Sequence, residues 1–147
     1  MFKISVLPLS VLVAATIGAT QAFAGMGSDM AEKHFNAIGS GDVSALGAEY
    51  DSNAVFQWVG GPLDGVYTGA GAITGLWTKF AKAQGKLDVD VMSIEESANP
   101  KGTTITAAVK FTGKKPIPVR YVLVYRGDKL VSEVWQIDPK LKVAYGN

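Results

Sequence analysis

The spacing of apolar residues divides the chain into a helical part and a strand-rich part. Apolar residues recur at three- and four-residue intervals over residues 30–38 and 70–83, which predicts two amphipathic helices. A shorter helix is expected over 42–50 and a strand over 54–59. From residue 86 the period falls to two, which predicts four more strands ending near residue 138. We therefore expect an α+β fold in which a curved antiparallel sheet wraps around three N-terminal helices to form a cone.

The last two strands, 118–126 and 129–138, are joined by Gly127-Asp128. Glycine at the first position of a two-residue loop favours a type II′ hairpin turn. A regular register then pairs Tyr121 with Val134 on one face of the hairpin. The opposite face holds Val122, Val124, Glu133 and Trp135.

Neither face of this hairpin is uniformly polar, so both are expected to be covered. The helices would cover one face and a second subunit the other. We predict a homodimer whose interface includes Val122, Val124 and Trp135. Glu133 is diagonal to Arg120 in this register and is expected to form an ion pair beside the interface.

The first residues are typical of a secretory signal rather than of a folded domain. Lys3 provides the positive charge, residues 6–17 the apolar run, and Ala22-Phe23-Ala24 a small-x-small cleavage site. We predict a signal peptide over 1–24 and a single domain over 25–147, exported to the periplasm or secreted. The apolar run is too short to span a membrane comfortably, so no membrane is expected as a partner of the mature form.

Composition excludes several classes of function. Lys3 is one of the 14 basic residues, and the 13 that remain equal the 13 Asp and Glu, so the mature net charge is zero. Without a basic field, a nucleic-acid partner is not expected. The chain has no cysteine and one histidine, and its carboxylates are not clustered, so we expect no disulfide framework and no metal site. No cofactor motif is present either: the glycines at 69, 71 and 75 do not have the dinucleotide spacing.

Several short segments carry a resemblance to a known superfamily. They are residues 50–56 (YDSNAVF), residues 65–69 (GVYTG) with Ala72-Ile73 opening a helix, and residues 127–130 (GDKL) before Asp138. In these segments the chain resembles the nuclear transport factor 2-like superfamily, particularly its SnoaL-like branch and ketosteroid isomerase. The resemblance covers nearly the whole of residues 25–147. It implies the cone-shaped fold far more strongly than any chemistry.

The isomerase pattern transfers only in part. The resemblance puts His34 in place of the oxyanion tyrosine, Trp58 in place of the catalytic aspartate, and Tyr121 in place of the protonated acid. An indole donates a hydrogen bond but cannot accept a proton, so isomerisation by that route is rejected. The acid of SnoaL-like cyclases corresponds to Asp138, which a regular register places on the Tyr121 face. His34 and Asp138 are therefore the candidate catalytic residues.

Three functions remain open on the sequence alone. The first is binding of a small apolar or aromatic molecule in the cone, in a pocket formed by Trp58, Tyr67, Trp77 and Tyr121. The second is a cofactor-independent isomerase, cyclase or dehydratase that uses His34 and Asp138 for proton transfer. The third is a protein-interaction module whose pocket is filled by its own side chains.

Overall fold

The computed structural model describes residues 25–142, so the predicted signal peptide lies outside the described residues. The elements are α1 (Met26–Ser40), α2 (Val43–Glu49), β1 (Tyr50–Val59), β2 (Gly65–Thr68), α3 (Ala70–Gln84), β3 (Asp88–Asn99), β4 (Gly102–Thr112), β5 (Pro116–Arg126) and β6 (Lys129–Ile137). Among the helices of this region, none has the length and apolar character needed to cross a membrane.

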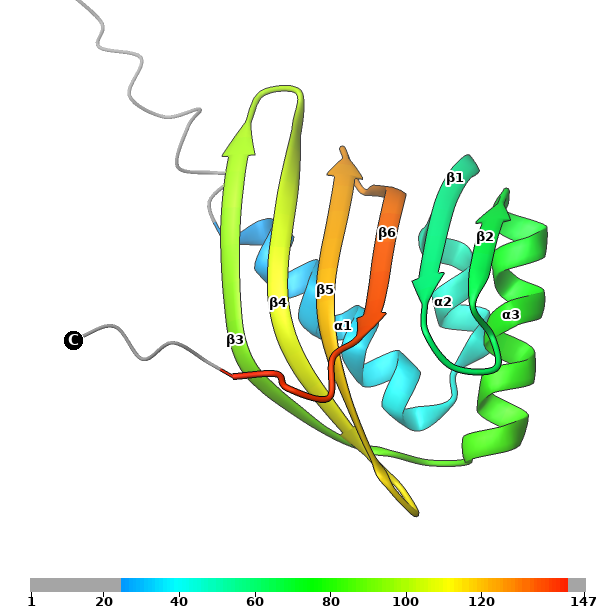
Figure 1. The fold of residues 1–147 in the computed structure, drawn as a ribbon. Coiled ribbons are helices and arrows are strands. Elements are labelled where there is room, and N and C mark those ends of the chain that lie inside the picture. Colours follow the sequence, from blue (N-terminus) through cyan, green and yellow to red (C-terminus); the bar gives the residue numbers. More distant parts are fainter. Residues whose placement is uncertain (1–24, 143–147) are drawn as a thin grey trace, which may run out of the picture.

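The strands form one curved sheet of six strands in the order β2-β1-β6-β5-β4-β3 (Figure 1). Five strands were expected, and the sixth, β2, lies where a loop was expected. The sheet is also mixed rather than purely antiparallel, because β1 runs parallel to β6. With these two corrections the expected α+β cone is confirmed.

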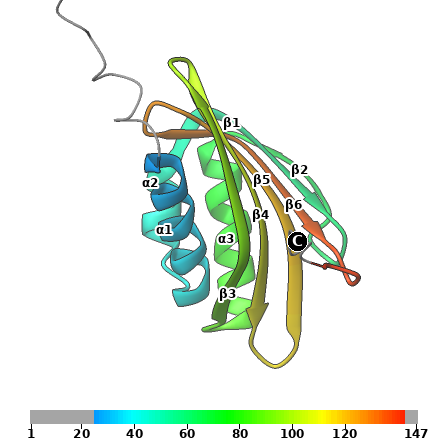
Figure 2. The ribbon, with the colours of Figure 1, turned by 90° about the vertical axis from the view of Figure 1, so that its left-hand side faces the viewer.

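The three helices lie on the concave face of the sheet (Figure 2). On α1 the predicted stripe of Ala31, Phe35 and Ile38 is fully buried. On α3 the buried residues are Ile73, Leu76, Trp77 and Phe80, which recur at the spacing of one helical face. The core therefore sits between these two helices and the inner face of the sheet.

The β5–β6 hairpin has the predicted turn but not the predicted register. Gly127 has φ +60°, whereas Asp128, like the other non-glycine residues of the described chain, does not have a positive φ. A type II′ turn requires positive φ at its first central residue only. Arg126 faces Lys129 and Tyr125 faces Leu130 as predicted, but Val124 then faces Ser132. Val131 is thus an extra residue, a β-bulge.

The bulge reverses the faces of all later residues of β6. Tyr121 faces Trp135 instead of Val134, and Leu123 faces Glu133. Both Glu133 and Trp135 are buried in the core, so their predicted place at an outer interface is wrong. A regular strand would put Leu130 and Trp135, five residues apart, on opposite faces, and the bulge lets both side chains enter the core.

The outer face of the sheet carries a patch of half-buried and exposed valines. Val122 and Val124 of β5 lie on it as predicted, half-buried. On the same face, Val134 of β6 pairs with Val122, and Val55 of β1 is separated from Val124 by Ser132. Val66 on the edge strand is 67% exposed and is separated from Val134 by Gln57. We call these five residues the valine patch.

Candidate functional site

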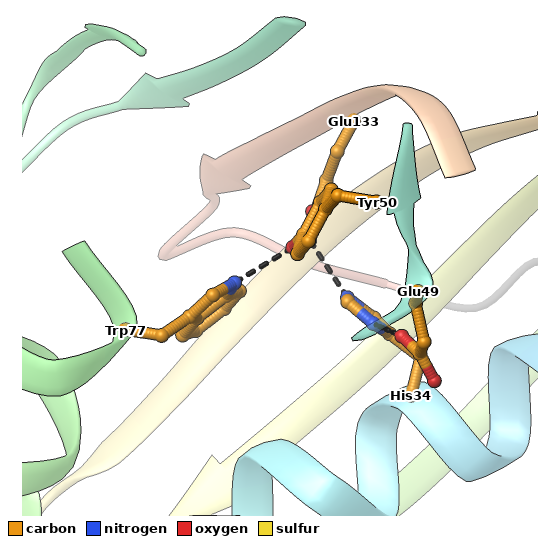
Figure 3. Close-up of polar contacts among 5 residues, drawn as sticks. All are labelled: His34, Glu49, Tyr50, Trp77 and Glu133. Carbon is orange, nitrogen blue, oxygen red and sulfur yellow. Dashed lines mark hydrogen bonds and ion pairs between the residues drawn. The ribbon is translucent and has the colours of Figure 1, made fainter. Parts of the chain in front are cut away.

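The core contains a chain of hydrogen bonds that joins five elements, α1, α2, β1, α3 and β6, and we call it the polar chain (Figure 3). It consists of His34, Glu49, Tyr50, Trp77 and Glu133. His34 Nδ1 lies 2.6 Å from Glu49 Oε2, and its Nε2 lies 2.9 Å from Glu133 Oε1. The Tyr50 hydroxyl donates to Glu133 Oε2 at 2.5 Å and accepts from Trp77 Nε1 at 2.7 Å.

The geometry at His34 favours the imidazolium form. A neutral imidazole has one N–H, so one of its two nitrogens would direct a lone pair at a carboxylate. Burial by itself would lower the pKa of His34. The charge of Glu133, supported by hydrogen bonds to Glu133 and Glu49, outweighs burial and raises this pKa to about 9. His34 is therefore a buried cation held between two acids.

The tyrosines near this chain are held in their neutral form. Burial, followed by the charge of Glu133, raises the pKa of Tyr50 and of Tyr121 well above the ordinary value. The Tyr121 hydroxyl is buried and has no hydrogen-bond partner among the described residues, and the same holds for Tyr125. Neither Tyr50 nor Tyr121 is therefore poised to lose a proton near neutral pH.

Aromatic side chains enclose the polar chain. The His34 ring lies 6.0 Å from that of Trp77 and 6.2 Å from that of Tyr121, both in edge-to-face contact. Next to them Trp135 stacks on Trp58, with ring centroids 4.3 Å apart. This packing leaves Glu49, whose side chain is 25% exposed, as the member nearest to solvent.

Asp138 is not part of this cluster. Its carboxylate pairs with the Arg120 guanidinium at 3.2 Å on the outer side of the sheet. The expected placement of Asp138 on the Tyr121 face fails because the bulge at Val131 shifts the register. The structure brings His34 together with Glu49 and Glu133 instead. Arg120, which was expected to pair with Glu133, pairs with Asp138.

The four aromatic residues expected around a pocket are distributed over two places. Trp77 and Tyr121 are buried beside His34, and neither is among the residues that line the cavity described next. Tyr67 is half-buried, and its hydroxyl donates to the Leu63 carbonyl at 2.7 Å. Of the four, Trp58 lines an apolar cavity of the described region, and the other three do not line that cavity.

This cavity of about 610 Å³ lies between the C-terminal turns of α3, the β1–β2 loop and the β4–β5 hairpin. Its apolar lining includes Trp58, Leu63, Phe80, Ile117 and Ile137. Three charged residues also line it, Lys79, Lys114 and Lys115, and no acidic residue does. Its volume falls in the range of about 300–1,000 Å³ that is usual for small-molecule sites.

Sequence reasoning missed three members of the polar chain. Glu133 was assigned to the other face, and Glu49 and Tyr50 were expected within a short helix rather than at the junction of α2 and β1. One signal was available. An acid between Leu130 and Trp135, in a strand that otherwise buries large residues, is typical of a charge with a buried partner.

The structure offers no site for a metal ion in the region it describes. No group of three or more His, Cys, Asp or Glu side chains between residues 25 and 142 is placed to hold one. The polar chain is saturated by its own contacts, since both nitrogens of His34 and both oxygens of Glu133 already have partners.

Comparison with known proteins identifies the family. The SnoaL-like domain matches residues 31–131, and the chain belongs to this family. No curated protein matches the chain.

Solved structures with the same fold include three bacterial proteins. An NTF2-like protein of unknown function from Pseudomonas putida KT2440 is 16% identical, with a TM-score of 0.69 over 81% of this chain and 89% of that one. A proposed dehydratase of the NTF2-like family from Streptomyces avermitilis is 14% identical, with a TM-score of 0.67 over 82% of this chain and 99% of that one. A hypothetical protein with a ketosteroid isomerase-like fold from Catenulispora acidiphila, in complex with trimethylamine, is 17% identical. Its TM-score is 0.55 over 76% of this chain and 86% of that one. At these identities the likeness concerns the fold alone.

Proposed function

We propose that this protein binds a small apolar or aromatic molecule in the 610 Å³ cavity. The observation that carries the proposal is an open, mostly apolar cavity of small-molecule size beside a core of buried aromatic and aliphatic side chains. Trp58, Phe80 and Ile117 offer ring and aliphatic surface, which is the usual lining of a ligand pocket. A cavity of this size also argues against a pure interaction module with a filled pocket.

Proton-transfer catalysis is the second candidate, and the geometry supports it less well. A general base must reach the reacting proton, within about 3 Å or through one water. His34, Glu133 and Tyr50 do not line the cavity, and the residues that do include no histidine or acid. The family likeness to a proposed dehydratase keeps this candidate open for substrates that would displace part of the aromatic packing.

Export and dimerisation complete the proposal. The signal-like residues 1–24 support an exported, periplasmic or secreted protein. The valine patch supports a homodimer, because a largely uncharged, partly exposed sheet face is suited to pairing with an identical one. Val124→Glu is expected to shift the protein to a monomer on size-exclusion chromatography, whereas Thr78→Glu, on the exposed side of α3 and away from the valine patch, serves as the control. A wild type that already elutes as a monomer contradicts the dimer.

The binding proposal is tested with the neutral fluorescent probe N-phenylnaphthylamine. Ala83 lines the cavity and Thr78 lies on the exposed side of the same helix. Ala83→Trp fills the cavity and should weaken probe binding at least about tenfold, whereas Thr78→Trp should not change it. Native mass spectrometry of the purified protein provides a second readout, with a co-purified small molecule expected. Equal probe binding by both variants, or none by the wild type, overturns the proposal.

A further inference from the structure

The charged residues of the cavity all have the same sign. Lys79 comes from α3, and Lys114 and Lys115 come from the bend between β4 and β5. The acids nearest in sequence to the cavity residues are engaged elsewhere: Asp64 accepts from the Gly60 amide at 2.7 Å, and Asp138 pairs with Arg120. Among the described residues, the four salt bridges involve none of the three lysines.

The C-terminal end of α3 opposes these charges but does not cancel them. A helix C-terminus carries about half a negative charge. Three lysines therefore leave the cavity mouth positive by about two and a half charges, in a protein whose net charge without the predicted signal is zero. Such a local field attracts an anionic group while the apolar lining takes up the rest of the molecule.

We infer that the ligand is a small amphipathic anion, and this inference rests on the proposed function. Its acidic group would lie at the three lysines and its apolar body against Trp58, Phe80 and Ile117. The lysine side chains are flexible and reach an acid in several positions, so a carboxylate, a sulfonate or a phosphate would satisfy them. This assigns an ion-pairing role to a bend that otherwise shows only two prolines and two exposed lysines.

The test compares two probes that share the same rings. Anilinonaphthalene sulfonate carries an acidic group that N-phenylnaphthylamine lacks. In the triple variant Lys79→Gln, Lys114→Gln, Lys115→Gln, sulfonate affinity should fall roughly tenfold, since each exposed pair contributes about 1.4- to 5-fold. Affinity for the neutral probe should change less than twofold. Lys82→Gln, also on α3 but outside the cavity, is the matched control for charge.

The outcomes separate this inference from the proposal on which it rests. If both probes bind and the triple variant weakens neither, the cavity binds ligands but the anion preference is overturned. If neither probe binds, the proposed function itself fails. A third experiment measures binding of the protein to phosphatidylglycerol vesicles by sedimentation. Lysine-dependent vesicle binding that Ala83→Trp leaves intact would assign the lysines to a membrane surface and overturn the inference.

A second observation concerns the start of α1, where one carboxylate collects three donors. Glu96 of β3 accepts from the Gly25 nitrogen at 2.8 Å, from the Gly27 amide at 2.9 Å and from the Ser28 hydroxyl at 3.1 Å. A Cβ added at Gly27 would lie 2.6 Å from Glu96 Oε1, so a larger residue here would displace the carboxylate from its present position.

The geometry points to Glu96 as the receptor for the new N-terminus after processing. The predicted cleavage site ends at Ala24. Hydrolysis there adds a hydroxyl to the Ala24 carbonyl and a proton to the Gly25 nitrogen, which takes up a further proton to become an ammonium. A neutral amide donor would thereby become a full charge beside a carboxylate, and the mature chain would gain an ion pair that the precursor lacks.

This inference is tested on the full chain exported from a bacterial host. Intact mass should show a chain that begins at Gly25. Acylation of its α-amino group should be roughly two- to fivefold slower than in Glu96→Gln, because the ion pair protects the ammonium form. Glu95→Gln on the same strand, an exposed acid without these contacts, should acylate like the wild type. A chain that begins elsewhere, or equal rates in Glu96→Gln and the wild type, overturns the inference.

Discussion

The polar chain and the cavity share three elements, β1, α3 and β6, and have opposite properties. Helix α3 contributes Trp77 to the polar chain and Phe80 to the cavity, three residues further on. Strand β6 contributes Glu133 to one and Ile137 to the other. The polar chain is charged, hydrogen-bonded and closed, whereas the cavity is apolar, open and positively charged only at its mouth.

This difference shows that a titratable cluster need not be the site of function. Shifted pKa values are enriched at active sites, but ion pairs in a core shift them too. Here each group with a shifted pKa is packed against an aromatic ring or another residue of the polar chain. Among the five residues of the polar chain, Glu49 has the most exposed side chain. The polar chain therefore holds α1, α2, β1, β6 and α3 together, and we propose that the ligand site is the cavity instead.

The largest effect is expected from removing one charge of the polar chain. Glu133→Gln leaves the His34 cation without its most buried partner, so the free energy of unfolding should fall by roughly 3–5 kcal/mol. Urea denaturation measures this, and Glu95→Gln on the surface is the control, with a change near zero. A loss under about 1 kcal/mol would mean that the core does not depend on this pair, and the contrast with the cavity would disappear.

The pH dependence of stability tests the charge of His34. Its folded pKa of about 9 lies above the ordinary value of 6.5, so its contribution is complete below about pH 6.5 and is lost as the pH rises through 9. The free energy of unfolding should therefore fall by up to roughly 3 kcal/mol between about pH 6 and pH 9. Glu133→Gln should flatten this slope. Stability that rises with pH over the same interval refutes the assignment.

Removing the Tyr50 hydroxyl tests how much the hydrogen bonds of the polar chain contribute to stability. Tyr50→Phe removes the hydroxyl that links Trp77 to Glu133 and leaves both without that partner. The expected cost is about 1–3 kcal/mol in unfolding free energy. Tyr125→Phe is the matched control, since its buried hydroxyl has no partner in the described chain, and it should be neutral or slightly stabilising. Similar losses in the two variants would show that the hydrogen bonds contribute nothing specific.

The smallest effect on stability is expected in the cavity. Ala83→Trp fills open space at an exposed helical position, so the free energy of unfolding should change by no more than about 0.5 kcal/mol. The same variant should abolish most probe binding, which is the reverse of the result expected for Glu133→Gln. Thermal denaturation with and without N-phenylnaphthylamine measures both. A large loss of stability in Ala83→Trp would mean that the cavity wall is part of the core.

Much of the fold follows from local patterns in the sequence. The apolar stripes of α1 and α3 and the turn at Gly127 depend on neighbouring residues only, and all were predicted. The inward orientation of His34 follows from the same helical spacing. The bounds of α1 were too short by four residues at its start, where Glu96 of a distant strand binds the first amides.

The candidate site was predicted less well because it depends on register. The regular pairing of β5 with β6 placed Asp138 near Tyr121 and Glu133 outside, and one bulged residue exchanged the two. Trp135 moved from a predicted interface into the core for the same reason. Unequal spacing of large apolar residues in β6 was the only local sign of the bulge.

The sequence by itself determined where helices and strands form, because periodicity and turn chemistry act over a few residues. Only the tertiary structure decided which acid meets His34, since Glu133 lies 99 positions away and a shift of one residue turns a strand side chain to the other face. The cavity likewise exists only once α3, the β1–β2 loop and the β4–β5 hairpin are assembled, because no single segment encloses it.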